Sequence, residues 1–182
     1  MSGSPIEESG AKRAAFEAVV SAYEGPLLRY VTRVVGGDRD TAQDVVQDTF
    51  IRLFRHWKDE FAPSPPLSTW LYRVAYNRAV DHFRRESRHA ALIERQAEEQ
   101  PDVVDPDRGE GFRISEAAEQ AAAGLKALSL REQQLVILKV YEEKSYREIS
   151  EITGLTVGNV GYILHHAMKK LARHFDGAAE AE

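Results

Sequence analysis

Cysteine is absent from this chain of 182 residues, and that absence already excludes several kinds of protein. Without thiols there is no disulfide, no thiolate metal site and no cysteine nucleophile. A chain without cysteine also fits a reducing compartment. No apolar run approaches the roughly 20 residues that span a membrane, and the acidic N-terminal stretch contains no segment typical of a signal peptide. We therefore expect a cytoplasmic protein.

Motifs of known enzyme chemistry are also missing. The sequence has no glycine-rich phosphate loop, no serine elbow and no HExxH pair. His165 and His166 are adjacent, but neighbouring helical residues point about 100° apart. No carboxylate lies three or four positions away to complete a metal site. We expect no catalytic residue, no metal, no cofactor and no small-molecule substrate.

Charge is unevenly distributed along the chain, whose formal net charge is −5. Five arginines oppose two acids in residues 68–88, and eight bases oppose five acids in residues 126–173. Between them, residues 94–119 carry nine acids and three arginines, with prolines and glycines typical of a solvated linker. The pattern predicts two domains and a flexible acidic linker, with these boundaries: 11–90, 91–113 and 114–176.

Apolar residues recur at helical spacing almost throughout, and no convincing period-two strand is present. The fold class is therefore expected to be all-α, with two small helical domains. Thr41 and Ser68 are candidate helix caps in the first domain, and Ser129 and Ser145 open capping boxes in the second. The expected helices are 14–35 with a bend at Gly25-Pro26, 41–57, 68–88, one from about 114, 130–142, 146–153 and one from Thr156 to about 175.

The last two helices have the length and glycine turn of a helix-turn-helix, in which a helix enters the DNA major groove. In the second of them, Val160, Leu164, Ala167 and Leu171 should pack inward. The side chains left outward are Asn159, Tyr162, His165, His166 and Lys169. A generic helical hairpin is the alternative interpretation of this segment.

Residues 68–88, STWLYRVAYNRAVDHFRRESR, carry a face of aromatic, amide and guanidinium groups beside two apolar stripes. Bases stack on aromatic rings and phosphates attract cations, so this face suits a melted nucleic-acid strand. An amphipathic core helix with a solvated arginine face explains the spacing equally well. The residues of the face are Trp70, Arg73, Asn77, Arg84 and Arg88.

Residues 44–55, DVVQDTFIRLFR, combine a buried stripe (Val46, Phe50, Leu53 and Trp57 just beyond) with a polar one that includes an isoleucine. Such a face could dock on a basic partner helix, or it could simply be solvated. Its residues are Asp44, Gln47, Asp48, Ile51 and Arg55.

Together, the 44–55 and 68–85 segments and the segment from Ala127 to Arg173 resemble the extracytoplasmic-function (ECF) branch of the sigma-70 family. The likeness covers about 16–88 and 118–173. It implies a promoter-recognition subunit of bacterial RNA polymerase, which binds core polymerase and promoter DNA, helps to open the strands, and is often masked by an anti-sigma factor. Such a protein is expected to be a monomer when free.

The resemblance also implies roles for individual residues. The 44–55 face would bind the clamp helices of the beta-prime subunit, and the C-terminal domain would meet the polymerase flap. The minus-ten element would be bound by Phe61, Trp70, Arg73, Asn77, Arg84 and Arg88. The minus-thirty-five element would be bound by Thr156, Val157, Asn159, Tyr162, His165, Lys169 and Lys170.

The sequence departs from the family pattern in its recognition helix, which contains Gly158 and Gly161 and lacks the usual arginines. Asn159, Tyr162 and the histidines could read bases or contact phosphates instead. A sigma-like decoy that binds an anti-sigma factor without reading DNA is therefore an alternative. A stand-alone helix-turn-helix regulator is a third, but it leaves the first ninety residues unexplained.

Overall fold

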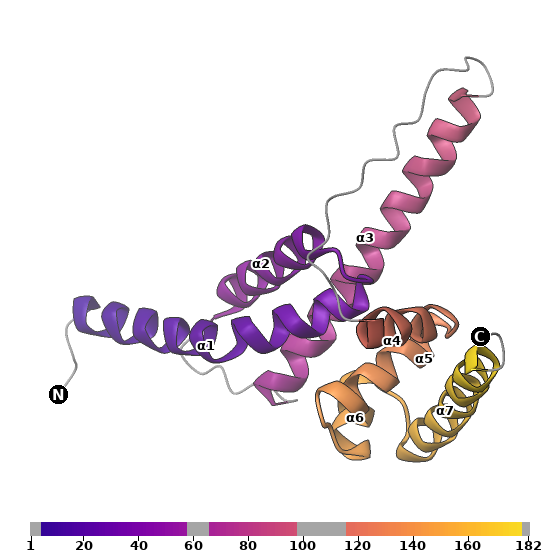
Figure 1. Ribbon diagram of the computed structural model, residues 1–182. Helices are drawn as coiled ribbons and strands as arrows, with labels where there is room; N and C mark the ends of the chain where they lie inside the picture. The colour runs from indigo at the N-terminus through magenta and orange to yellow at the C-terminus, as the bar shows by residue number, and fades with distance from the viewer. Residues whose placement is uncertain (1–4, 58–65, 98–115, 180–182) are drawn as a thin grey trace.

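The computed structural model describes residues 5–57, 66–97 and 116–179, and the regular structure in these ranges is entirely helical (Figure 1). The prediction of an all-α protein with two helical domains is confirmed. The first group of helices comprises α1 (Pro5–Val34), α2 (Arg39–His56) and α3 (Leu67–Ala97). The second comprises α4 (Glu116–Lys126), α5 (Leu130–Val136), the π-helical segment η1 (Ile137–Tyr141), α6 (Tyr146–Thr153) and α7 (Val157–Ala179).

The first group is a bundle in which each of the three helices packs against the other two. Its interior is built from apolar side chains at the helical spacing that the sequence shows. The fully buried ones include Leu27, Tyr30, Val31, Leu53, Leu71, Ala75 and Ala79.

Helix α2 begins earlier than expected because its cap is Asp38 and not Thr41. The Thr41 backbone N–H donates to Asp38 Oδ1 (3.0 Å), and the Thr41 hydroxyl donates to Oδ2 (2.8 Å). These two hydrogen bonds lower the pKa of the Asp38 carboxyl. A carboxylate at the N-cap accepts a hydrogen bond from a backbone N–H that has no partner within the helix. Its negative charge is also stabilised by the positive end of the helix dipole.

The other two helices of this group are longer than the sequence predicted. Helix α1 begins at Pro5 and continues through Pro26, which removes one backbone donor without ending the helix. Helix α3 begins at Leu67, so Ser68 lies in its first turn and is not its cap. It continues to Ala97 through nine residues without glycine or proline. The expected linker therefore starts within α3, and its residues 98–113 lie outside the described ranges.

The capping boxes predicted in the second group are confirmed. Ser129 pairs with Glu132 at the start of α5, and Ser145 pairs with Glu148 at the start of α6. The expected helix 130–142 is divided, because five residues from Ile137 widen into η1. Gly154 ends α6 in the left-handed conformation (φ 73°), which glycine adopts without strain.

The two groups of helices are in contact. Helix α3 packs against α6, and α1 packs against η1. Buried residues from both groups belong to one continuous hydrophobic cluster. The outer face of α2 and most of α7 remain open to solvent.

Candidate functional site

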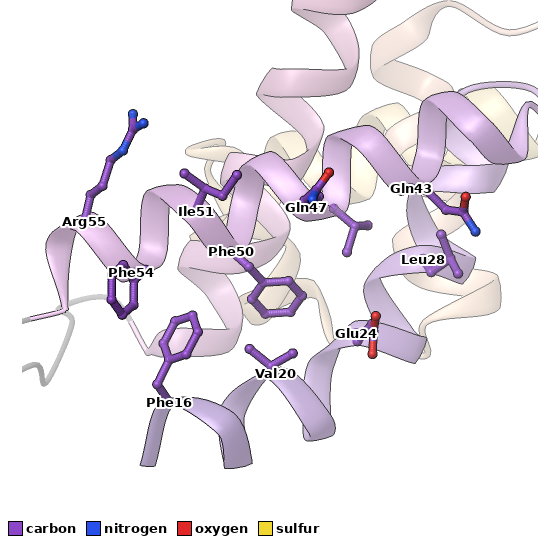
Figure 2. Close-up of a pocket in the computed structure, with 11 residues that line it drawn as sticks. Phe16, Val20, Glu24, Leu28, Gln43, Gln47, Phe50, Ile51, Phe54 and Arg55 are labelled. Carbon is purple, nitrogen blue, oxygen red and sulfur yellow. The ribbon is translucent and has the colours of Figure 1, made fainter. Parts of the chain in front are cut away.

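An apolar groove runs between α1 and α2 (Figure 2). Gln47, Ile51 and Arg55, three of the five residues expected to bind a partner on α2, line it. Ile51 is 41% exposed and Phe54 is 65% exposed, which is unusual for side chains of this size. The groove is lined by Phe16, Val20, Glu24, Leu28, Gln43, Val46, Gln47, Phe50, Ile51, Phe54 and Arg55.

The α1 wall of this groove is not expected from the sequence. The rings of Phe16 and Phe54 meet edge to face with centroids 5.2 Å apart (Figure 2). Phe16 also meets the ring of Trp57 edge to face. Phe16 and Val20 are four positions apart, which places them on one helix face. That spacing was visible in the sequence, but it did not indicate that the face would be left partly open.

Asp48 is engaged within the protein and does not line the groove. Its carboxylate forms an ion pair with Arg78 of α3 and a longer one with Arg52 of α2 (3.4 Å). Asp44, by contrast, is exposed. Asp44 and Asp48 are the two acids expected to face a partner. Asp48 also holds α2 to α3 through its ion pair with Arg78.

The polar face of α3 brings Arg73, Asn77 and Arg84 together along one polar cavity. Asn77 and Arg84 are exposed, whereas Arg73 is half-buried. Trp70 instead packs against the hydrophobic cluster and is half-buried. Phe61 and the side chain of Arg88 lie outside what the structure describes. The cavity is closed on its other side by residues of the second group, among them Arg131 and Gly154.

Arg73 makes the most specific contacts on this face. Its Nε donates to the carbonyl of Ile152 (3.1 Å), and its Nη2 donates to the carbonyl of Glu151. Beside it, the Tyr76 hydroxyl donates to the carbonyl of Leu130 (3.2 Å). The sequence predicts a role for Arg73 toward DNA, but in this structure its hydrogen-bond partners are backbone carbonyls of the second group.

Helix α7 has the two faces that its sequence predicted. Val160, Leu164 and Ala167 are buried, and Leu171 packs against the cluster while half-buried. Thr156 caps the helix by accepting a hydrogen bond from the Asn159 backbone N–H (3.2 Å). The side chains that remain exposed include Val157, Asn159, Tyr162, His165, His166 and Lys169.

Two contacts on α7 decide which of its side chains are available at the surface. Tyr162 is 66% exposed and its ring lies 4.3 Å from that of His166, so the pair forms one aromatic patch. Lys170 turns toward α5, where its Nζ donates to Glu132 Oε1 (2.7 Å). This hydrogen bond is the main cause of a lowered pKa at Glu132. Of the two lysines expected at DNA, Lys170 has a partner within the protein.

Among the described residues, no helix is long and apolar enough to cross a membrane. The same residues contain no group of three His, Asp or Glu side chains that could hold a metal ion. The arrangement is that of a helical protein with surfaces for macromolecular partners: an apolar groove, a polar helix face and a helix-turn-helix.

Comparison with known proteins identifies the family to which this chain belongs. Residues 19–89 match the family model described as sigma-70 region 2, and residues 118–171 match the one described as sigma-70, region 4. The two matches cover both helical groups. The chain belongs to the sigma-70 family of RNA polymerase sigma factors, in its ECF branch.

Individual relatives agree with this placement. The chain is 27% identical over 172 residues to the RNA polymerase sigma factor YlaC of Bacillus subtilis, covering 93% of this chain and 97% of that protein. It is 27% identical to the ECF sigma factor SigW of the same organism, covering 87% and 88%. Two solved structures share the fold. The sigma factor RpoE in complex with the anti-sigma factor NepR from Bartonella quintana has a TM-score of 0.65, 18% identity, and coverage of 89% and 97%. CnrH in complex with the cytosolic domain of CnrY has a TM-score of 0.66, 24% identity, and coverage of 94% of each chain.

Proposed function

We propose that this protein directs bacterial core RNA polymerase to a subset of promoters and helps to open the DNA there. The observation that carries the proposal is the presence of region 2 and region 4 on one chain, with a helix-turn-helix whose second helix is exposed. Catalysis then belongs to the polymerase, and the protein works in the cytoplasm where the polymerase is.

The α1–α2 groove is the proposed surface for core polymerase. Its apolar walls and the charged and amide groups at its rim suit an amphipathic helix of a partner, and the clamp helices of the beta-prime subunit are such a partner. Gln47, Ile51 and Arg55 would contact the clamp from the α2 rim of the groove, and the exposed Asp44 from beside it.

The polar face of α3 is the proposed surface for the melted minus-ten strand, through Arg73, Asn77 and Arg84, with Trp70 at its start. Phe61 and Arg88 complete the proposed set. Exposed amide and guanidinium groups on one helix suit bases and phosphates of a single strand.

Helix α7 is proposed to lie in the major groove of the minus-thirty-five element. Its exposed first turns, with Val157, Asn159 and Tyr162, would meet base edges, while His165 and Lys169 would reach the backbone. Thr156 would position the helix start.

RpoE was solved in complex with the anti-sigma factor NepR, and CnrH was solved in complex with the cytosolic domain of CnrY. This supports an anti-sigma partner for the present chain as well. A decoy that only binds such a partner would share the fold but would not support transcription.

The test is run-off transcription with purified core polymerase, using promoter fragments selected from a randomised library. We expect selected templates to be transcribed only when the protein is present. Core binding without any transcription would favour the decoy, and no core binding would reject the proposal.

The groove is tested by Ile51→Asp, with Ile51→Leu as the matched control. Ile51 lies outside the buried core, so both variants should fold. A charge in the groove should lower affinity for core polymerase by more than tenfold, whereas leucine should leave it nearly unchanged. Equal affinities of the two variants would exclude this groove as the docking surface.

A further inference from the structure

Tyr162 is a large side chain on the exposed face of α7, and one side of its ring faces open space. The side chain is 66% exposed. In a helix a side chain leans over the residue one turn before it, which for Tyr162 is Gly158. An added Cβ at Gly158 would meet no described residue within 4 Å beyond the helix backbone around it. The surface on that side of the Tyr162 ring is therefore free for a ligand to approach.

The other side of Tyr162 is in contact with a second ring. His166 lies one turn later on the same helix face, and the two ring centroids are 4.3 Å apart, with the planes tilted by 57°. His166 in turn meets His165, at a centroid distance of 5.7 Å. Both histidines are exposed, so these rings touch at the protein surface and not in its core. Tyr162 is thus supported on one side by His166 and open on the other.

Such support is useful to an exposed side chain that has to bind. An unsupported side chain at the surface moves between rotamers, and holding it in one of them costs free energy when a complex forms. Contact between two rings one turn apart favours a single arrangement before any ligand arrives. A side chain that is already ordered loses less freedom on binding. The contact between His166 and Tyr162 has the geometry for this effect.

We propose that His166 is a positioning residue, which holds the Tyr162 ring in the orientation that α7 presents to a base pair of the minus-thirty-five element. The inference rests on the proposed placement of α7 in the major groove, where residues near the helix start meet base edges. His166 lies one turn further along the helix than Tyr162. It therefore acts through Tyr162 and makes no contact of its own with DNA.

The size of the expected effect follows from the cost of ordering one side chain, which corresponds to roughly a two- to tenfold change in affinity. Only the matching base pair holds the Tyr162 ring in place. Loss of the His166 ring should therefore lower the preference of the holoenzyme for that base pair by roughly two- to tenfold. Loss of Tyr162 should lower the preference for the same base pair by about tenfold or more.

The experiment uses holoenzyme reconstituted with each full-length variant, and measures competition between the selected promoter and one with the Tyr162 base pair changed. His166→Phe keeps a ring beside Tyr162 but cannot form a hydrogen bond, whereas His166→Gln keeps hydrogen-bonding groups without a ring. We expect His166→Phe to retain most of the wild-type preference and His166→Gln to lose it. The matched control is Met168→Ala, which removes another exposed side chain of α7 and should leave the preference unchanged.

A double-mutant cycle distinguishes positioning from direct contact. If His166 acts only through Tyr162, His166→Gln should change the preference by less than about twofold when Tyr162 is already alanine. An equal effect of His166→Gln in both backgrounds would show that His166 contacts DNA itself, and would overturn the proposal. Retained preference in His166→Gln, or lost preference in His166→Phe, would overturn it as well.

Two further measurements keep the interpretation clear. In the free protein, nuclear Overhauser effects between the Tyr162 and His166 rings should be present, and their absence would overturn the inference. Melting curves should be the same for all variants, because both side chains are exposed. If Tyr162→Ala selects the same sequences as wild type, the proposed reading of bases by α7 fails. If Tyr162→Ala changes selection and His166→Gln does not, only the role of His166 fails.

Discussion

Glu132 and Glu148 occupy equivalent positions in two capping boxes, yet we expect them to differ in their contribution to stability. Each accepts hydrogen bonds from the backbone N–H and hydroxyl of its serine. Glu132 is buried and also accepts from Lys170 of α7, which ties α5 to α7, whereas Glu148 is exposed. Glu148→Ala therefore measures a capping box alone, and Glu132→Ala measures a capping box plus a contact between helices.

The expected magnitudes follow from these contacts. Each glutamate variant keeps its cap serine but loses the hydrogen bonds that the serine backbone N–H and hydroxyl donate to the carboxylate, at a net cost of about 1 kcal/mol. A half-exposed ion pair with good geometry contributes up to about 1 kcal/mol. The free energy of unfolding should fall by about 2 kcal/mol for Glu132→Ala and by about 1 kcal/mol for Glu148→Ala. Lys170→Met should cost up to about 1 kcal/mol, and adding it to Glu132→Ala should cost little more, because the pair is already broken.

Urea unfolding of the full chain can assign these losses to the second group of helices. Both tryptophans, Trp57 and Trp70, belong to the first group, so their fluorescence reports that group, while far-UV circular dichroism reports both. A shift seen by circular dichroism and not by fluorescence belongs to α4–α7. Equal losses for the two glutamate variants, or a Lys170→Met loss that adds fully to Glu132→Ala, would refute the assigned role of Lys170.

The pH dependence gives an independent check. The hydrogen bond from Lys170 lowers the pKa of Glu132 in the folded protein, so folding favours the ionised carboxylate. The contribution of the ionised Glu132 carboxylate to the free energy of unfolding is complete above the pKa of a glutamate in the unfolded chain, about 4.3. This contribution is lost as pH falls through the lower pKa that Glu132 has in the folded protein. The stability difference between wild type and Glu132→Ala should therefore shrink below about pH 4.

Three further predictions concern the binding surfaces and α7. Asp44→Lys should weaken core polymerase binding without changing the unfolding midpoint, whereas Asp48→Lys should lower both the affinity for core polymerase and the unfolding midpoint, because Asp48 is paired with Arg78 of α3. A binding titration and a melting curve for each variant decide this. Gly161→Ala should raise the free energy of unfolding by about 0.5–1 kcal/mol, since an added Cβ would make only an ordinary 3.5 Å contact; a lower melting temperature would contradict it. Substitution of Asn159 or Tyr162 by alanine should change which minus-thirty-five sequences a holoenzyme selects, by about 1–3 kcal/mol at the matching base pair, and unchanged selection would show that α7 does not read bases there.

Local features of this protein could be predicted from its sequence. The two serine capping boxes and the buried face of α7 depend on residues within one or two helical turns, and their spacing is decisive. The sequence favours Thr41 as the cap of α2, but Asp38 three positions earlier is the residue that accepts the capping hydrogen bond. Asp38 is not among the caps expected from the sequence: both residues carry side-chain oxygens within one turn, and helical spacing does not choose between them.

Contacts between distant segments could not be predicted in the same way. Asp48, Arg73 and Lys170 are charged residues on amphipathic helices, and the sequence treated all three as available to partners. The structure pairs them with Arg78, with carbonyls of α6 and with Glu132. Which charges are left for partners depends on how the helices pack, and helical periodicity does not contain that information.

The pairing of Lys170 also bears on how region 4 can contribute to promoter binding. The protein carries a formal charge of −5, so it gains little affinity from release of counterions on DNA. With Lys170 held by Glu132, the exposed cations toward the end of α7 are Lys169 and Arg173. Two phosphate contacts give a shallow salt dependence and weak binding on their own. In the proposed function, core polymerase would then supply most of the affinity, and α7 would act chiefly by choosing among sequences through its first turns. Lys169→Ala should therefore weaken all promoters about equally and flatten the salt dependence, whereas Lys170→Ala should change stability and leave the salt slope as it is.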